Sequence, residues 1–149
     1  MAKKTKIRLI GRREFIDFPE LGIERIEGKI DTGAYTSSIH CENISINYED
    51  SKPVLYFTVE QDGVKTLRFE KFDRKKIKNS FGEMEERYVI KTIFKIGKKK
   101  VRSVISLSNR DNMRFPVLIG RRLLKGKFLI DVKHVHTGGE NVIKALKKM

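Results

Sequence analysis

The stretch Lys29-Ile-Asp-Thr-Gly-Ala-Tyr-Thr-Ser-Ser-Ile-His40 contains the most informative pattern in the sequence. A predicted strand ends at Ile30, and the four residues that follow have the composition of a tight turn. Gly33 allows a ligand to approach the backbone closely, because glycine has no side chain. We therefore expect the Asp31 carboxylate to lie on a turn that a ligand can reach.

A carboxylate on an Asp-Thr-Gly turn is typical of aspartic peptidases. Their chemistry needs two facing carboxylates with a water between them, one protonated as the acid and one ionised to activate the water. The chain contains a single Asp-Thr-Gly, so a symmetric homodimer in which each chain contributes Asp31 would supply the pair. The alternative is that Asp31 closes an ordinary structural turn.

A second informative segment is Phe115-Pro-Val-Leu-Ile-Gly-Arg-Arg-Leu-Leu124, in which Gly120 lies 89 residues after Asp31. Two branched apolar residues precede this glycine, and a short helix is predicted over 121–125. Here the sequence resembles the retropepsin-like aspartic peptidases, in which a hydrophobic, hydrophobic, Gly segment packs beneath the Asp-Thr-Gly loop. The residues that match this segment are Leu118, Ile119, Gly120 and Arg121.

A closer resemblance extends over nearly the whole chain. Besides the stretch 29–40, it rests on Gly11-Arg-Arg-Glu14, Pro19-Glu-Leu-Gly22, Glu85-Glu-Arg-Tyr-Val-Ile90 and Asn109-Arg-Asp-Asn-Met-Arg-Phe115. These motifs look like the bacterial and archaeal retropepsin-like family long named ATP-dependent zinc proteases. That family is similar to proteins associated with ATP-grasp ligases that add glutamates to a ribosomal protein, and the resemblance implies cleavage of such tails.

The resemblance also implies roles for individual residues. Asp31 is the expected catalytic carboxylate, Thr32 is expected to brace the two loops across the dimer, and the Gly33 backbone is expected to meet the substrate. Many viral retropepsins continue with acidic residues after the alanine, whereas this chain has Tyr-Thr-Ser-Ser over 35–38. The way in which those enzymes hold a substrate backbone therefore does not transfer to this chain. The candidate substrate-binding residues beyond the glycine are Ala34, Thr36, Ser37 and His40.

The name ATP-dependent zinc protease is not supported by the residues. A phosphate-binding loop needs four residues between its glycines and a Ser or Thr after its lysine. In this chain five residues, 121–125, separate Gly120 from Gly126, and Phe128 follows Lys127. The only potential nitrogen and sulfur ligands for zinc are His40, Cys41, His134 and His136. We therefore expect neither a cofactor nor a metal.

The positions of these four residues in the sequence favour structural roles for them. His134 and His136 would share one face of a strand, which leaves an adventitious metal site open, although two exposed histidines are the simpler interpretation. His40 and Cys41 are neighbours and would point to opposite faces of a strand, which argues against a nucleophile and base pair. Cys41 is therefore predicted to be a buried or surface thiol.

Charge suggests the kind of partner. The chain has 33 lysines and arginines against 19 acidic residues, a net charge of +14, and 39% hydrophobic residues, which describes a folded, strongly basic protein. Such a protein attracts anions. Lysine clusters favour nonspecific attraction to nucleic acid, and a non-catalytic basic module for RNA or an acidic protein is the alternative function. An acidic peptide is the preferred partner, and its candidate ligands are Arg68, Arg87, Arg110, Arg114 and Arg121.

The remaining sequence predicts strands and few helices. Alternating apolar residues over 6–30, 44–46, 54–60, 64–72, 88–96 and 101–107 predict strands, with hairpin turns at Asp62-Gly63 and at 97–100. A tail helix is expected over 140–149, with Val142, Ile143 and Leu146 on one face. The polar segment between Phe72 and Arg87 lacks either period and predicts a long mobile loop or lid.

Together these patterns predict a mainly β protein. They leave a small β-barrel or a sandwich as the architecture of a single domain over 1–149. The resemblance implies a closed retropepsin-like β-barrel, with one short helix after the Leu-Ile-Gly segment and a helical tail. The longest apolar run, 54–57, is far shorter than the roughly 20 residues that span a bilayer, and the single cysteine fits a reducing compartment. The expected location is cytoplasmic, without a membrane partner.

Overall fold

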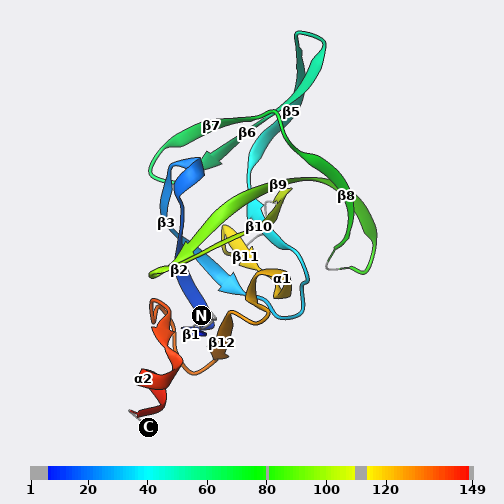
Figure 1. Ribbon diagram of the computed structural model, residues 1–149. Coiled ribbons are helices and arrows are strands. Elements are labelled where there is room, and N and C mark those ends of the chain that lie inside the picture. Colours follow the sequence, from blue (N-terminus) through cyan, green and yellow to red (C-terminus); the bar gives the residue numbers. More distant parts are fainter. Residues whose placement is uncertain (1–6, 80, 110–113, 148–149) are drawn as a thin grey trace, which may run out of the picture.

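A six-stranded barrel forms the centre of the fold in a computed structural model that describes residues 7–79, 81–109 and 114–147 (Figure 1). The strands pair in the order β10-β4-β11-β3-β2-β9, and β9 pairs again with β10, which closes the ring. The prediction of a mainly β, closed barrel is confirmed. Its strands are β2 (Arg13–Phe18), β3 (Ile23–Ile30), β4 (Ser37–His40), β9 (Met84–Ile96), β10 (Lys99–Ser108) and β11 (Val117–Ile119), with a 3-10 turn η1 (Pro19–Leu21) after β2.

The predicted hairpins are confirmed where the turn chemistry was clear. β6 (Lys52–Glu60) and β7 (Val64–Phe69) are joined at Asp62 and Gly63, whose φ angles of 54° and 108° are those that a tight hairpin demands. With β5 (Glu42–Glu49) they form a separate three-stranded sheet. The buried face of β6 joins this sheet to the barrel core, because Leu55, Phe57 and Val59 belong to the same apolar cluster as the barrel residues.

The segment between Phe72 and Arg87 is a β-hairpin, so the prediction of a long loop is wrong. β8 (Asp73–Lys78) pairs along its whole length with the start of β9. β8 has no buried residue, and all of its side chains except Ile77 are charged, so they show no period of two. The strand is specified by backbone pairing and by a cross-strand ion pair between Arg74 and Glu86 at 2.9 Å. We call the hairpin 73–87 the flap.

The two ends of the chain meet in a small sheet at one end of the molecule (Figure 1). β1 (Arg8–Gly11) lies between β12 (Phe128–Asp131), which is parallel to it, and β13 (Glu140–Asn141), which is antiparallel. The predicted tail helix, α2 (Val142–Lys147), starts two residues later than expected because 140–141 pair with β1. The prediction for 148–149 lies outside the described residues. No residue of α2 is buried.

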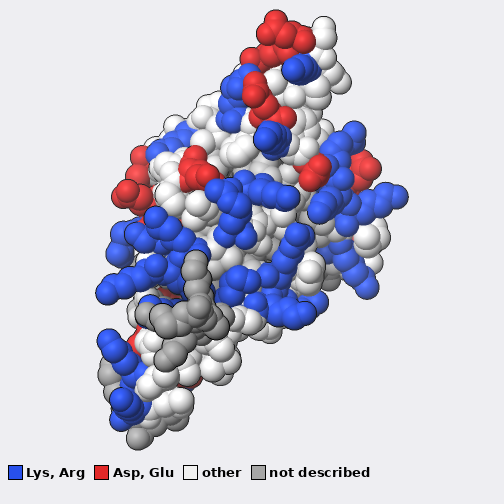
Figure 2. Space-filling view, in the orientation of Figure 1, with Lys and Arg blue, Asp and Glu red and all other residues white. Residues whose placement is uncertain are grey.

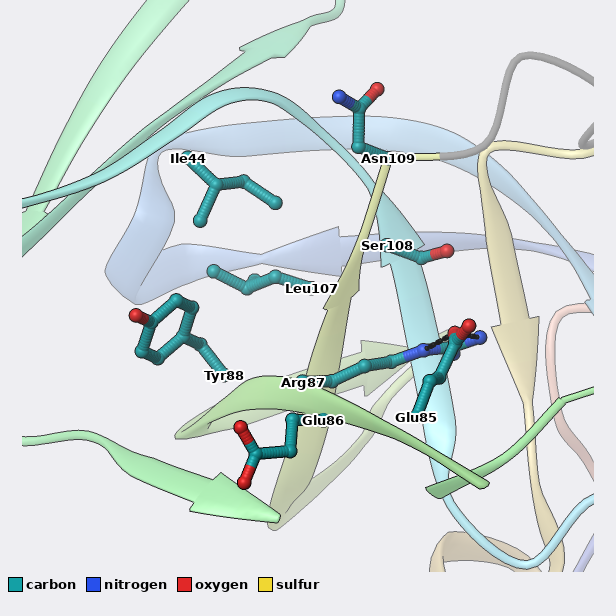
Figure 3. A pocket seen from close by; sticks show the side chains of 8 residues that line it. All are labelled: Ile44, Glu85, Glu86, Arg87, Tyr88, Leu107, Ser108 and Asn109. Carbon is teal, nitrogen blue, oxygen red and sulfur yellow. Dashed lines mark hydrogen bonds and ion pairs between the residues drawn. The ribbon is translucent and has the colours of Figure 1, made fainter. Parts of the chain in front are cut away.

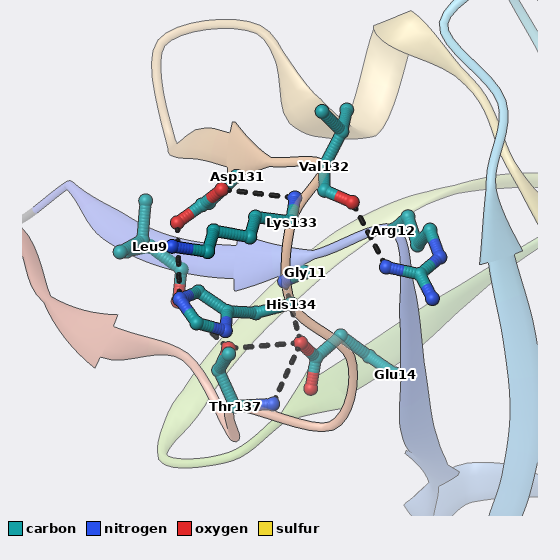
Figure 4. A network of polar contacts seen from close by, with 9 residues as sticks. All are labelled: Leu9, Gly11, Arg12, Glu14, Asp131, Val132, Lys133, His134 and Thr137. Carbon is teal, nitrogen blue, oxygen red and sulfur yellow. Dashed lines mark hydrogen bonds and ion pairs between the residues drawn. The ribbon is translucent and has the colours of Figure 1, made fainter.

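A buried carboxylate fastens the C-terminal segment to the barrel (Figure 4). The Glu14 side chain is on β2 and the residue is only 1% exposed. Its Oε2 accepts hydrogen bonds from Gly11 N at 2.7 Å, Thr137 N at 3.0 Å and Thr137 Oγ1 at 2.9 Å, and its Oε1 accepts one from Gly138 N at 2.9 Å. Four donors from two distant segments therefore converge on one side chain.

Within the described ranges, no helix combines the length and apolar character that crossing a bilayer requires.

Candidate active site

The Asp31 turn is held in place by backbone hydrogen bonds. β3 ends at Ile30, the Asp31 N–H donates to the carbonyl of Ile119 at 2.8 Å, and the Ala34 N–H donates to the carbonyl of Asp31 at 3.2 Å. The Gly33 N–H donates to Asp31 Oδ1 at 3.0 Å, which orients the carboxylate. Asp31 is partly exposed, so a ligand can reach the carboxylate, as the sequence predicts.

The Leu118-Ile119-Gly120 segment packs against this turn, as the resemblance implies. β11 lies between β3 and β4, and α1 (Arg121–Leu124) begins directly after Gly120. The Arg121 and Arg122 N–H groups donate to the carbonyls of Ala34 and Tyr35 at 2.8 and 2.9 Å. Two segments that are far apart in sequence thus form one rigid unit around Asp31.

Gly120 is required by this close packing, and its replacement by alanine is expected to be costly. A Cβ on Gly120 would lie 2.6 Å from the carbonyl oxygen of Tyr35, which is backbone and cannot move aside. We expect Gly120→Ala to lower the free energy of unfolding by about 3 kcal/mol in urea denaturation.

The matched control for this substitution is Gly28→Ala. A Cβ on Gly28 would meet the terminal methyl of Ile16 at 2.4 Å, and that flexible end can rotate away. A loss of about 1 kcal/mol is expected there. Equal losses for the two variants would show that Gly120 is not held against a rigid neighbour.

A cleft of about 930 Å³ lies between the Asp31 turn and the flap. The flap contributes Asn79 and Phe81 at its tip, where Phe81 is 81% exposed. Asp31 is the only acidic residue among the described lining residues. The basic side chains that line the cleft are Lys29, Lys76, Lys78, Arg87, Arg114 and Arg121.

The cleft separates the arginine predictions. Arg87, Arg114 and Arg121 line it, whereas Arg110 lies outside the described residues. Arg68 is not among the lining residues, contrary to its selection as a substrate ligand. It pairs on the β5-β6-β7 sheet with Glu49 and Glu70, each at 3.1 Å, and these hydrogen bonds raise its pKa.

The other predicted residues are also divided. Gly33, Ala34 and Thr36 line the cleft. Ser37 does not line it: the residue is 1% exposed, and its Oγ accepts a hydrogen bond from the Gly120 N–H at 3.0 Å, so it has a structural role. His40 does not line the cleft either, and its Nε2 lies 3.8 Å from a Glu42 carboxylate oxygen.

Thr32 also lies outside the cleft lining. Its carbonyl accepts a hydrogen bond from Arg121 Nη1 at 2.9 Å. This contact holds the Arg121 side chain beside the turn, where its guanidinium carbon lies 5.8 Å from the centre of the Tyr35 ring. The expected bracing role of Thr32 across a dimer stays a prediction.

Three lysines of the cleft were missed by the sequence analysis. Lys29 could have been found, because residues two apart on a strand share a face and Lys29 is two residues before Asp31. Lys76 and Lys78 could not, because they reach the cleft only through the pairing of β8 with β9.

The thiol and the histidines lie away from the cleft lining. Cys41 is 1% exposed, and burial raises its pKa to about 12, so it is not a thiolate nucleophile. The two later histidines are exposed, as the simpler interpretation predicts, but they are not on a strand: His134 lies 3.5 Å from Asp131, and His136 lies 2.6 Å from Glu27. In the described part of the chain, no three His, Cys, Asp or Glu residues form a cluster able to hold a metal ion.

A closed barrel with one Asp-Thr-Gly turn seated on a Leu-Ile-Gly strand defines the retropepsin-like class. The sequence profile of the RimB-like family, described as "Retropepsin-like aspartic endopeptidase RimB", matches residues 9–139. The chain belongs to this family.

Similar proteins carry a different name. The chain is 38% identical over 136 residues to a protein of Desulfotalea psychrophila and 38% identical over 128 residues to one of Shewanella halifaxensis, each named "Probable alpha-L-glutamate ligase". The alignments cover 88% and 83% of this chain but 29% and 28% of those proteins, so the chain spans less than a third of their length.

A solved structure shares the fold. The crystal structure of Lpg0085 from Legionella pneumophila, a protein of unknown function (DUF785), superposes with a TM-score of 0.71 at 24% identity, covering 88% of this chain and 98% of that one. This likeness concerns the fold alone.

Proposed function

We propose that the chain is an aspartic peptidase that hydrolyses peptide bonds in an acidic, glutamate-rich peptide or protein tail. The observation that carries the proposal is the Asp31 carboxylate on a hydrogen-bonded turn in a cleft where the other charged lining residues that the structure describes are all basic. Membership of the family supports the reaction, and the glutamate ligase name of the relatives supports a glutamate substrate.

The proposed mechanism uses two Asp31 side chains. Two carboxylates a few ångströms apart share one proton, because both cannot be ionised at that distance. The ionised carboxylate takes a proton from the water as it attacks the peptide carbonyl, and the protonated one donates to that carbonyl oxygen. Proton transfer to the amide nitrogen then breaks the C–N bond.

A homodimer is proposed because the chain has one Asp-Thr-Gly. The terminal sheet offers an apolar surface for it: Ile7, Leu9 and Leu129 share one face, and Ile7 and Leu129 are 38% and 50% exposed. α2 adds Ile143 and Leu146, 65% and 61% exposed. Burial of such side chains against a second copy is favourable. This surface is also close in sequence to the segment beneath Asp31, because only three residues separate α1 from β12.

The acidic substrate is proposed from the charge of the cleft. Among the described residues, six lysines and arginines and one aspartate line it, and field lines concentrate in a cleft whose charges are mostly of one sign. Arginine side chains can also bind carboxylates through two parallel hydrogen bonds. An extended chain of glutamates would therefore be attracted and held beside Asp31.

Cleavage of matched peptides tests this proposal. Oligo-α-glutamate, oligoglutamine and a mixed neutral peptide are incubated with the protein, and new amino termini are counted. We expect kcat/KM for the glutamate peptide to exceed that of the neutral ones at least about tenfold and to fall as salt is added, because salt screens the attraction. A chelator is expected to change nothing.

Two outcomes would contradict the proposal. Cleavage that a chelator abolishes would indicate metal chemistry, and absence of cleavage of every peptide would favour the alternative of a non-catalytic basic module. Figure 2 shows the surface that favours this alternative: lysine and arginine side chains are spread over the face around β8 and β9 and outnumber the acidic ones there, while acidic side chains gather at the β5–β6 tip. Binding to RNA that weakens steeply with salt, without hydrolysis, would support it.

A further inference from the structure

A second, smaller pocket adjoins the catalytic cleft. It has a volume of about 290 Å³ and shares Arg87 and Ser108 with the cleft lining. Figure 3 shows Ile44, Leu107 and Tyr88 at one end of this pocket and the Arg87 guanidinium at the other. An apolar wall that ends in a cation suits a side chain with an aliphatic stem and an acidic head.

The Arg87 guanidinium is already paired with a carboxylate of its own chain. Nε and Nη2 of Arg87 both contact Glu85 Oε1, and both residues are on β9, where side chains two residues apart share a face. The Arg87 side chain is 10% exposed, whereas that of Glu85 is 37% exposed. Glu85 is therefore the more exposed member of the pair.

Glu85 is also next to the turn of the flap. Asn79 Nδ2 lies 3.5 Å from Glu85 Oε2, and Asn79 Oδ1 accepts hydrogen bonds from the N–H groups of Phe81 at 2.9 Å and Glu83 at 3.0 Å. The group that pairs with Arg87 is therefore in contact with the part of the flap that lines the same cleft as Asp31.

We propose that Arg87 determines specificity for a substrate glutamate and that Glu85 occupies it in the free protein as a stand-in for that glutamate. The substrate carboxylate replaces Glu85 on the guanidinium, its stem lies along Leu107, and the Glu85 carboxylate turns toward solvent. This inference rests on the proposed function and assigns a subsite of it to named residues.

The exchange explains how the pocket rejects neutral side chains. A buried guanidinium without a carboxylate is costly, so Arg87 releases Glu85 only when another carboxylate takes its place. A glutamine has the same shape but no charge, and cannot complete the exchange. One substrate position should therefore distinguish glutamate from glutamine much more strongly than its neighbours do.

A positional scan tests the proposal. In an oligo-α-glutamate peptide, each glutamate in turn is replaced by glutamine, and kcat/KM is measured for every peptide. In the wild-type protein we expect one position at which the replacement lowers kcat/KM about 10- to 100-fold, the range of a hydrogen-bonded charge pair. In Arg87→Gln this difference disappears at that position only, while discrimination elsewhere stays.

Two further variants separate recognition from a structural role. Glu85→Gln removes the competitor, so KM for the all-glutamate peptide is expected to fall severalfold, whereas a purely structural pair would give weaker binding. Arg87→Lys keeps the charge without the two-pronged geometry and is expected to lose most of the discrimination if Arg87→Gln does not fold.

Arg74→Gln is the matched control. Arg74 is on the same hairpin, pairs with Glu86 at 2.9 Å and lines neither pocket. Arg74→Gln removes the same charge as Arg87→Gln but leaves the Arg87 guanidinium in place, so discrimination between glutamate and glutamine at the sensitive position should be unchanged. If Arg74→Gln and Arg87→Gln reduce discrimination equally, general charge explains the effect and the subsite is overturned.

Binding measurements distinguish this inference from the peptidase proposal. The same peptides are titrated into Asp31→Asn protein, so that binding is measured without turnover. The ratio of the affinities for the glutamate and glutamine peptides is then compared between this protein and the double variant that also carries Arg87→Gln. Loss of selectivity at one position supports the subsite even if hydrolysis proves independent of Asp31. Unchanged selectivity at every position overturns it even if hydrolysis requires Asp31.

Discussion

Asp31→Asn is expected to lower the hydrolysis rate at least about 1,000-fold while the fold is retained. Asparagine has the same shape, and its carbonyl oxygen can still accept the hydrogen bond that Gly33 N–H donates to Oδ1 at 3.0 Å. It cannot take a proton from water, so the general base is lost from both copies of a dimer. Initial rates on the glutamate peptide, with circular dichroism as the check on folding, measure the effect.

Mixing experiments make the same substitution a test of the paired site. If one Asp31 from each copy forms the site, then dimers with one Asn are inactive. Random exchange of equal amounts of wild type and variant would leave about a quarter of the wild-type activity per dimer. A residual of one half would show that each chain works alone. Asp62→Asn, in the exposed β6–β7 turn, is the control for loss of one negative charge.

Glu14→Gln is expected to lower the free energy of unfolding by about 2–4 kcal/mol. The carboxylate is 1% exposed and accepts four hydrogen bonds, two of them from Thr137. An amide keeps one acceptor oxygen and turns an NH₂ group toward N–H donors, which leaves buried donors unsatisfied. Urea denaturation at fixed protein concentration measures the loss.

The control for this prediction is Glu24→Gln, because Glu24 is exposed on β3. A surface change of that kind is expected to alter the free energy of unfolding by no more than about 0.5 kcal/mol. Because Glu14 joins β2 to the segment that leads into β13, hydrogen exchange should also increase in the terminal sheet. Similar losses for the two variants would contradict a special role for Glu14.

Local rules were sufficient where each residue's environment is set by its neighbours in sequence. The hairpin at Asp62-Gly63 was predictable because its turn needs residues that tolerate positive φ. The short helix expected over 121–125 after Gly120 is observed as α1, one residue shorter. The flap was missed because β8 is exposed on both faces, so no alternation marks it. Period reveals a strand only when burial differs between its faces.

The sequence by itself determined the mainly β class and the Asp31 turn, because these depend on apolar alternation and turn chemistry. The closed barrel and the Gly120 segment beneath the turn were implied by the family resemblance, and the structure adds the physical reason, because Gly120 has no room for a Cβ. Only the tertiary structure decided which basic residues surround Asp31. Arg68 and Arg87 look alike in sequence, yet one pairs with Glu49 on a distant sheet and the other lines the cleft. The reason is physical: an arginine is charged wherever it lies, and whether it faces the cleft is decided by the pairing of strands that are remote in the chain.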